Sequence, residues 1–538
     1  MSIMSDIIQR IEVGGQSIVP GVIKGLITDN ETKKQRMITN YNRYKVEHDA
    51  VPIFTRKFEV ENKINRQLND TFDSDIIDVK VGYMLGNPII YGLDQEKYKT
   101  GEVVNIEAIK KDRSVIDDFN KRNNVPFLDS ETLKMASICS YSARLLYINT
   151  DGIETVMNVD PWECIFVKDG SLNESQYALR YYDIIDVQDK KKHVYVEFYD
   201  KQFVYYYISS DVIDDQTRKS DIIFIPYQKN GKEFQPHMFD GVPLIRFENN
   251  TELQGDCDKV YSLIDAYDAG ISDISSEIEQ FRLAYMAFYG IAPDEEVMKK
   301  AKKTGAFGMP DPECRIEFVT KNLNNTAVEN LLDRLADNIY KFAKSVNFSD
   351  EAFSGNVSGV AMKYKMFGLE SKSITSERNF TSALNAMYKI LCSAWKTKGT
   401  DIDYTNITYL WTRNFPLNLL DESQSSMNLK GLISEKTRLG LLSFIDDPEQ
   451  EMKRMAVENE GSIDLNEDTS ETGEVTEETL TAPASVQTSL NGAQMQSLLS
   501  IIQSVASKTL SRTAAINLIT SSLPLSQAQA ESIIEENV

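Results

Sequence analysis

The sequence predicts a mixed α+β protein of several domains, built around a long helical hairpin that carries a small α/β unit. Three observations lead to this fold class. The chain has 538 residues, which is too long for a single hydrophobic core. Residues 143–247 alternate apolar and polar side chains, as antiparallel strands do. Residues 251–282 and 325–347 space their apolar side chains four and three apart, which is typical of paired helices.

The N-terminal part, residues 1–125, reads mainly as helices. The stretch DTFDSDIIDVKVGYML (70–85) is one of them, and Gly86, Asn87 and Pro88 end it. The next stretch, IIYGL, is extended. Residues 143–247 are rich in Tyr, Val, Ile and Phe and are interrupted by Asp-Gly, Asn-Gly and Pro signals. This pattern predicts successive antiparallel strands joined by hairpins.

Two amphipathic segments then form the predicted hairpin. The apolar seam of each segment is spaced by alternate steps of four and three, and the seams consist of Val260, Ile264, Tyr267, Ile271, Ile274, Ile278 and Phe281, and of Val328, Leu332, Leu335, Ile339, Phe342 and Val346. Acidic residues Asp265, Asp268, Asp273, Glu277 and Glu279 cover the other faces of the first helix. Such narrow seams must be buried against the hairpin mate or against neighbouring subunits.

The remaining elements follow the same rules. Between the two helices lies a small unit with a basic helix (EEVMKKAKKTG), a Gly-Pro turn and a strand (CRIEFV). A long helix, 360–398, is broken near Gly368 and carries Leu384, Met387, Leu391 and Trp395 on one side. Residues 401–415 form a strand that returns to the earlier sheet, and short helices occupy 419–457. Glu458 to Glu478 is densely acidic and reads as a disordered linker, followed by helices with Ser511 and Ser526 as N-caps.

The composition limits the classes of function. With 58 basic and 81 acidic side chains the net charge is −23, which argues against a protein that coats nucleic acid. The five cysteines, at positions 139, 164, 257, 314 and 392, have no paired spacing, so we expect reduced thiols in a protein of the cytoplasm. We expect no signal peptide at the start MSIMSDIIQR and no membrane-spanning segment.

The sequence also lacks the common catalytic signatures. It contains no phosphate-binding loop, no dinucleotide fingerprint and no nucleophile elbow. The three histidines, His48, His193 and His237, are read as surface or loop residues. The acid pairs Asp73/Asp75 and Asp256/Asp258 could hold a divalent metal, but such pairs more often stabilise a helix start or are solvated. We therefore expect no enzymatic activity, no metal and no cofactor.

Four stretches carry a resemblance to a known family. They are VKVGYMLGNPIIY (79–91), SARLLYINTDG with VDPWE (142–163), VPLIRFENNTELQGDCDKVYSLIDAYD (242–268) and SGVAMKYKMFGLESK (358–372). In this order and over roughly residues 53–460, the chain resembles the portal proteins of tailed bacteriophages of the SPP1-like type.

The resemblance implies a dodecameric ring around a DNA channel at one capsid vertex, assembled in the cytoplasm of the host bacterium. It implies a wing (1–250 and 360–418), a stem (251–282 and 325–347), a clip (283–324), a tunnel loop (348–359) and a crown (419–460), followed by the acidic linker (461–490) and C-terminal helices (491–538). The implied partners are other copies of the chain, double-stranded viral DNA, the terminase large subunit, head-completion or adaptor proteins, and the major capsid and scaffolding proteins. No membrane partner is implied.

The resemblance also suggests site residues. The loop that projects into the channel corresponds to residues 349–359, with the candidates Asp350, Glu351, Phe353, Ser354, Gly355, Asn356, Ser358 and Gly359. Its glycines allow different poses against a DNA helix whose symmetry differs from that of the ring. Candidate cationic rings in the channel are Arg334, Lys341 and Lys344, with helix-surface ion pairs to Asp333 or Asp337 as the alternative. Candidate docking residues of the clip are Lys299, Lys300, Lys302 and Lys303, with a solvated helix face as the alternative.

Two other functions stay open at this point. The chain could be a cytoplasmic helical scaffold that binds a partner and conducts no DNA. A metal-dependent nuclease that uses the clustered acids is the third reading.

Overall fold

A computed structural model describes residues 3–58, 64–100, 103–168, 175–185, 192–213, 220–281, 285–290, 294–306, 311–319, 325–348, 362, 364–414, 419–442, 445, 448–463 and a few isolated positions between 505 and 531. The contacts between residues divide the chain into two compact units. The first consists of Met1–Ile433 with Leu441–Phe444, and the second of Ser434–Gly440 with Ile445–Val538.

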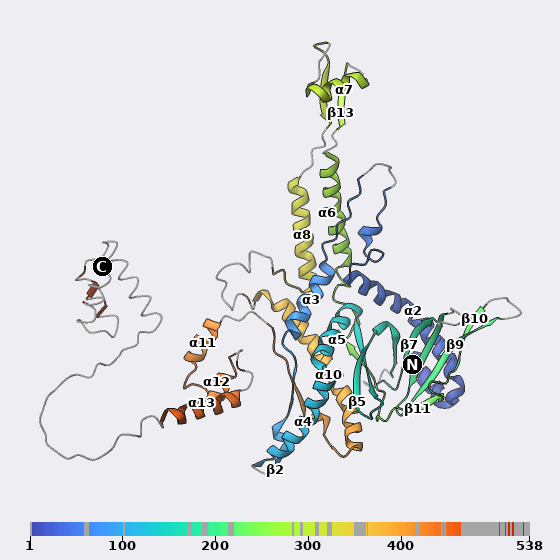
Figure 1. Cartoon of the computed structure of the whole chain (residues 1–538), viewed down its shortest axis with the longest axis vertical. Coiled ribbons are helices and arrows are strands. Elements are labelled where there is room, and N and C mark those ends of the chain that lie inside the picture. The colour runs from blue at the N-terminus through green and yellow to red at the C-terminus, as the bar shows by residue number, and fades with distance from the viewer. Residues whose placement is uncertain are drawn as a thin grey trace. The chain divides into compact units, whose positions relative to one another are not determined.

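The first unit contains both helices and strands (Figure 1). Its helices are α1 (Ile3–Gly14), α2 (Val19–Tyr44), α3 (Phe72–Leu85), α4 (Ile106–Arg122), α5 (Val125–Cys139), α6 (Tyr261–Phe281), α7 (Glu295–Thr304), α8 (Asn325–Ala343), α10 (Phe367–Thr397) and α11 (Leu419–Asn428). Its strands are β1 (Ile90–Leu93), β2 (Lys99–Thr100), β3 (Val103–Val104), β4 (Tyr141–Ile148), β5 (Glu154–Val159), β6 (Cys164–Val167), β7 (Tyr177–Ile185), β8 (Lys192–Tyr199), β9 (Phe203–Ile213), β10 (Ser220–Pro226), β11 (Phe234–Pro236), β12 (Leu244–Glu248), β13 (Tyr285–Tyr289), β14 (Arg315–Val319) and β15 (Ile407–Leu410). The second unit contains α12 (Glu435–Leu439) and α13 (Pro448–Ile463).

The predicted antiparallel strand region is confirmed, and it forms two sheets. Strands β6 to β10 pair in the order β10-β9-β8-β7-β6, with β11 also on β9. Strands β12, β4 and β5 form a separate three-stranded sheet in the order β12-β4-β5. The strands are not all buried on one face alone, because the side chains of β4 and β6 are buried on both faces along most of their length. Helices α1 and α2 supply a helix layer for the larger sheet, with Ile23 and Leu26 packed against Leu179 and Phe198.

The long helix α10 organises the second core. Its predicted apolar side, which includes Leu384, Met387, Leu391 and Trp395, is buried as expected. These side chains pack with Phe247 of β12 and with residues of α4 and β1. A turn at Met366 separates the helical residues 364–365 from α10, so the break predicted near Gly368 is present two residues before it, and α10 itself continues through Gly368.

Helices α6 and α8 lie side by side as the predicted hairpin (Figure 1). A Cβ on Gly270 of α6 would lie 3.1 Å from Cδ2 of Leu332 on α8, so the helices approach closely at this level. The chain between them forms β13, α7 and β14, and β13 pairs with β14 in an antiparallel hairpin. The small α/β unit predicted between the two helices is therefore confirmed, with one strand more than the sequence indicated.

The strand predicted at 401–415 is present but joins a different sheet. β15 pairs with β1, from Ile90↔Leu410 to Leu93↔Ile407, whereas we expected it in the sheet of residues 143–247. Its partner is the short extended stretch IIYGL. The N-caps predicted at Ser511 and Ser526 and nearly all of the acidic linker lie outside the described residues, although α13 continues to Ile463.

Four of the five cysteines are buried and Cys314 is partly exposed, all as free thiols. His237 lies in the loop after β11, in keeping with its prediction as a surface or loop residue, and it is buried there. Its ring lies 3.1 Å from the carbonyl oxygen of Asp200. Within the described ranges, no helix combines the length and apolar character that crossing a bilayer requires.

Candidate functional site

One polar stripe on α6 is buried against another segment of the chain. Asp268, Ser272 and Ser276 lie on one face at intervals of four, and all three are nearly inaccessible. Residues 66–70 run along this stripe. The backbone N–H groups of Arg66 and Leu68 donate to the hydroxyls of Ser276 and Ser272, each over 2.9 Å. This face of the first hairpin helix is therefore held by hydrogen bonds to a neighbouring backbone.

The acidic faces of α6 are paired as well. Asp268 accepts from the side chain of Asn69 over 2.7 Å. Asp273 forms an ion pair with Arg56 over 2.7 Å, and Glu279 one with Arg66. We expected acidic residues that simply cover the outer faces of the helix. Instead the segment that precedes α3 lies along them, and its arginines provide the opposite charge.

The apolar seam between α6 and α8 is buried most completely at one end, although Leu332, toward the other end of α8, is only 8% exposed. Ile264 and Ile339 are inaccessible, close to the start of α6 and the end of α8. Toward the other end and on the outer sides, large apolar side chains stay open: Ile278 is 57% exposed, Leu331 54% and Phe342 53%. Isolated exposed apolar residues are common, but these three lie on one helix pair, and each is more than half exposed.

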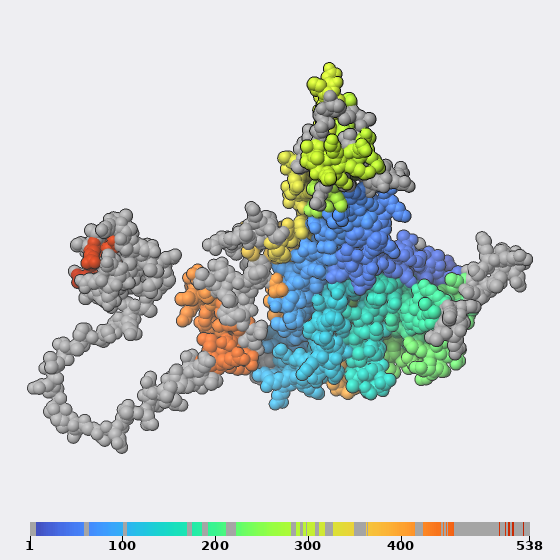
Figure 2. Space-filling view, turned by 45° about the horizontal axis from the view of Figure 1, so that its top comes forward, coloured from blue at the N-terminus to red at the C-terminus, as the bar shows by residue number. Residues whose placement is uncertain are grey.

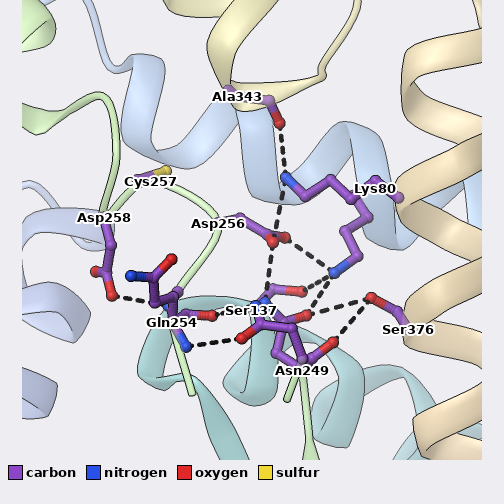
Figure 3. Close-up of polar contacts among 12 residues, drawn as sticks. Lys80, Ser137, Asn249, Gln254, Asp256, Cys257, Asp258, Ala343 and Ser376 are labelled. Carbon is purple, nitrogen blue, oxygen red and sulfur yellow. Dashed lines mark hydrogen bonds and ion pairs between the residues drawn. The ribbon is translucent and has the colours of Figure 1, made fainter. Parts of the chain in front are cut away.

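The buried end of the helix pair contains a polar network (Figure 3). Lys80 of α3 is fully buried; its ammonium donates to Asn249 Oδ1 at 2.7 Å and Ser137 Oγ at 3.1 Å, and it forms an ion pair with Asp256, 3.0 Å from Oδ2. Asn249 also donates to Asp256 over 3.0 Å, so the network is continuous.

A second lysine reaches the same carboxylate from α10. Lys372 Nζ lies 3.1 Å from Asp256 Oδ1 and donates to the carbonyl oxygen of Ala343 over 2.8 Å. Ala343 is the last residue of α8, and a cation is favourable at the carbonyl end of a helix. One turn further along α10, Ser376 donates to Asn249 Oδ1 over 3.3 Å. The network thus connects α3, α5, α8, α10 and the loop that precedes α6.

Two cations therefore share one carboxylate in this network. Burial lowers the pKa of Lys80 to about 8, although the charge of Asp256 acts in the opposite direction. Burial works to raise the pKa of Asp256, but Lys372 and Lys80 together outweigh it and keep the pKa well below its usual range. Asp256 is consequently ionised under all ordinary conditions and is the only negative charge facing the two ammonium groups within the described residues.

A second buried ion pair lies near the start of α6. Arg43 of α2 is 3.3 Å from Asp73 and 2.8 Å from Asp265, and its guanidinium lies over the ring of Tyr261 at 4.4 Å. Burial raises the pKa of Asp73 to about 6, an effect that Arg43 offsets only in part. Asp73 and Asp256 were expected to stabilise helix starts or to be solvated. Asp73 does lie in the first turn of α3, as expected, but it and Asp256 are buried ion-pair partners and are not solvated.

The residues predicted for the channel are only partly described. All tunnel-loop candidates (Asp350, Glu351, Phe353, Ser354, Gly355, Asn356, Ser358 and Gly359) lie outside the described residues. Arg334 and Lys341 are exposed on α8, and Lys344 is exposed directly after it at a positive φ of 53°. Within the described ranges none of the three forms an ion pair with Asp333 or Asp337.

The clip lysines all lie on α7 and are exposed. Lys299 pairs with Glu295 over 3.0 Å, one turn away. Figure 2 shows the surface of the β13–α7–β14 unit in yellow-green on its visible face. The four lysines are thus accessible, which fits either a docking surface or a solvated helix face.

Sequence reasoning missed the lysines of the buried network. Lys80 stands in the stretch IIDVKVGYML, where apolar residues surround it on nearly every helical face. A lone lysine in such a helix is a signal of a buried, paired cation. Lys372 carries no comparable signal, because its neighbours in sequence are polar. Among the residues that the structure describes, no group of His, Cys, Asp and Glu is arranged to hold a metal ion.

Comparison with known proteins assigns the family. The model of the family described as "Phage portal protein, SPP1 Gp6-like" matches residues 23–464. The chain is 22% identical over 453 residues to the portal protein of Clostridium phage phiCD119, which covers 80% of this chain and 94% of that protein. It is 25% identical over 420 residues to the portal protein of Bacillus phage SPP1, covering 74% and 77% respectively. The chain therefore belongs to the SPP1 Gp6-like family of phage portal proteins.

Proposed function

We propose that the chain forms a ring of twelve subunits at one capsid vertex and that viral DNA passes through the central channel during packaging and ejection. The ring would nucleate assembly of the procapsid with the major capsid and scaffolding proteins. The clip would dock the terminase large subunit and, later, head-completion or adaptor proteins. The role is structural, because the terminase would hydrolyse ATP.

The observation that carries this proposal is the helix pair α6–α8. Ile278, Leu331 and Phe342 are more than half exposed on it, and in an isolated subunit their apolar area would face water. Burying such a side chain fully contributes about 1.5–3 kcal/mol. A ring supplies the cover, because each subunit then presents one side of its helix pair to each neighbour.

The charge of the chain is compatible with a channel through which DNA slides. The net charge of −23 repels phosphates, so DNA would not be held tightly along the whole channel. Exposed cations on or next to α8, Arg334, Lys341 and Lys344, would be repeated around the ring and would moderate this repulsion locally. The tunnel loop, residues 349–359, would contact the DNA directly.

The test is the assembly state of the purified chain. Native mass spectrometry and negative-stain microscopy should show a ring of about a dozen subunits with a central hole. A small compact particle under all conditions would instead favour the helical scaffold protein. The channel assignment is tested separately by the variant Asn356→Cys, with crosslinking to DNA in packaged heads. Four of the five native cysteines are buried, which keeps the background low, and the absence of a crosslink would count against the loop assignment.

The clip assignment has its own test. Replacing Lys300, Lys302 and Lys303 by Gln should weaken binding of the terminase large subunit while leaving the ring intact. All three are exposed on α7, so the substitutions remove charge without disturbing a core. Unchanged terminase binding at low salt, where charge effects are strongest, would identify α7 as a merely solvated face.

A further inference from the structure

The ammonium group of Lys372 contacts the loop that leads into one stem helix and the end of the other. On one side it lies 3.1 Å from Asp256, in the loop that leads into α6. On the other side it donates over 2.8 Å to the carbonyl oxygen of Ala343, where α8 ends. The lysine itself belongs to the second turn of α10. A single side chain therefore joins the start of one stem helix, the end of the other and the long helix of the wing.

These contacts are shielded from water. The side chain of Lys372 is 15% exposed and that of Asp256 2%. A small apolar cluster made of Val346 after α8, Met366 and Leu369 at the start of α10, and Val79 and Tyr83 of α3 packs at the same junction. Hydrogen bonds to charged groups are stronger when water is excluded, so this contact resists separation of α10 from the stem.

The partner lysine has a different set of contacts. Lys80 holds Asp256 from α3 and also binds Asn249 and Ser137, but no contact joins it to α8 among the described residues. Its role is therefore to fix Asp256 within the body of the wing. Lys372 adds the connection from that fixed point to the two stem helices and α10.

We propose that Lys372 is a positioning residue that couples α10 to both stem helices at their base, so that displacement of one of these helices is transmitted to the others. The significance for DNA passage rests on the proposed portal function, because the chain between α8 and α10 includes the predicted tunnel loop. The coupling itself rests only on the contacts of Lys372.

Hydrogen–deuterium exchange of the full-length protein tests the coupling. Lys372→Met removes both contacts and leaves Asp256 paired with Lys80, so the body should stay folded. We expect amides in residues 337–348 and 364–376 to exchange about ten- to a hundredfold faster, which is the effect of losing a charge-assisted hydrogen bond. Lys372→Arg should restore much of the protection.

The matched control is Lys396→Met on the same helix, which removes a surface ion pair to Asp401 with a side chain that is 67% exposed. This control should leave exchange in both segments unchanged. The variant Lys80→Met should lower the melting temperature but should not accelerate exchange selectively in 337–348. If Lys372→Met fails to fold, Lys372→Gln, which keeps a donor for Ala343, replaces it.

The proposal is overturned if exchange in the two segments is unchanged in Lys372→Met, or if it rises evenly across the whole first unit. Native mass spectrometry of the same samples separates this from the proposed function. A wild-type chain that forms no ring, together with selective loosening in Lys372→Met, would refute the portal ring and support the coupling. A wild-type chain that forms rings, together with no selective loosening in Lys372→Met, would support the portal ring and refute the coupling.

Discussion

Removing the carboxylate of Asp256 should be one of the most damaging single substitutions in the first unit. In Asp256→Asn, the ammonium groups of Lys80 and Lys372 lose the negative charge that lies 3.0 and 3.1 Å away. Removing one partner of a buried ion pair costs about 3–5 kcal/mol, because the remaining charge stays buried without compensation. Here two cations are left rather than one.

The network can limit this loss by releasing a proton. The pKa of Lys80 is already lowered to about 8, and neutralising a group one pH unit below its pKa costs about 1.4 kcal/mol. We therefore expect Asp256→Asn to lower the free energy of unfolding by about 3 kcal/mol, the lower end of the range for a broken buried ion pair. At roughly 2 °C per kcal/mol for a unit of this size, the melting temperature of the first unit should fall by about 6 °C at pH 7.

Differential scanning calorimetry at several pH values provides the assay. The lysine pKa is about 8 in the folded chain against the ordinary value of 10.5, so between these values the unfolded chain binds more protons and the contribution of Lys80 to stability rises with pH. Asp256→Asn removes a charge that raises the pKa of Lys80, so in this variant the increase of stability with pH should begin below pH 8. The variant should therefore recover part of its deficit between pH 7 and 9.

The double variant Asp256→Asn/Lys80→Met is the control. It removes the fully buried cation together with the carboxylate, so it should melt above the single variant Asp256→Asn at pH 7 and should lose the pH-dependent recovery. A single variant that melts within about 1 °C of the wild type would refute the reasoning. The same holds if the double variant is less stable than the single one, because the cost would then not come from unpaired charge.

Three further substitutions test other parts of the structure. Phe342→Glu places a charge on a side chain that is 53% exposed in the single chain, so it should reduce ring formation in native mass spectrometry while the melting temperature of the subunit changes little; intact rings would exclude this surface from the interface. Asp73→Asn should flatten the pH dependence of stability between about pH 4 and 6. Burial raises the pKa of Asp73 to about 6, so in this pH range the folded wild-type chain binds more protons than the unfolded chain and its stability falls as the pH rises. Thermal melts of both proteins over this range would detect the difference. Arg144→Met leaves Asp129 buried without its guanidinium partner at 2.8 Å and should lower the free energy of unfolding by about 3–5 kcal/mol. The melting temperature should fall, and the double variant Arg144→Met/Asp129→Asn should partly restore it. Equal melting temperatures of the single and double variants would contradict the role of the ion pair.

Local pattern was sufficient for the type of most elements. The four-three spacing of the two stem segments, the period-two region and the apolar side of residues 384–395 each depend on neighbours within one or two turns or on one strand. Such periodicity indicates which face of an element is buried, and it does not depend on what packs against that face. The sheet predicted for β15 was wrong for the same reason, because the pattern of a strand does not show which strand it pairs with.

The family resemblance did not predict the candidate site, because Lys80, Asp256 and Lys372 all lie within the resembling stretches and their network was still missed. The clip lysines, a feature of composition, were found on an exposed helix as expected. The role of Asp268, Ser272 and Ser276 was not predicted, because a polar stripe on a helix reads as solvated unless the segment that covers it is known. Arg56 and Arg66 become partners of α6 only through the path of the chain before α3.

By itself the sequence determined the helical hairpin, the strand region, the inserted α/β unit and, through the four resembling stretches, the family. Only the tertiary structure decided that Lys80, Asp256 and Lys372 share one buried network at the base of the stem. The physical reason lies in the range of the two kinds of interaction. Apolar burial follows a local period that can be read along the chain, whereas a buried charge is stabilised by a specific partner that the fold brings from a distant position.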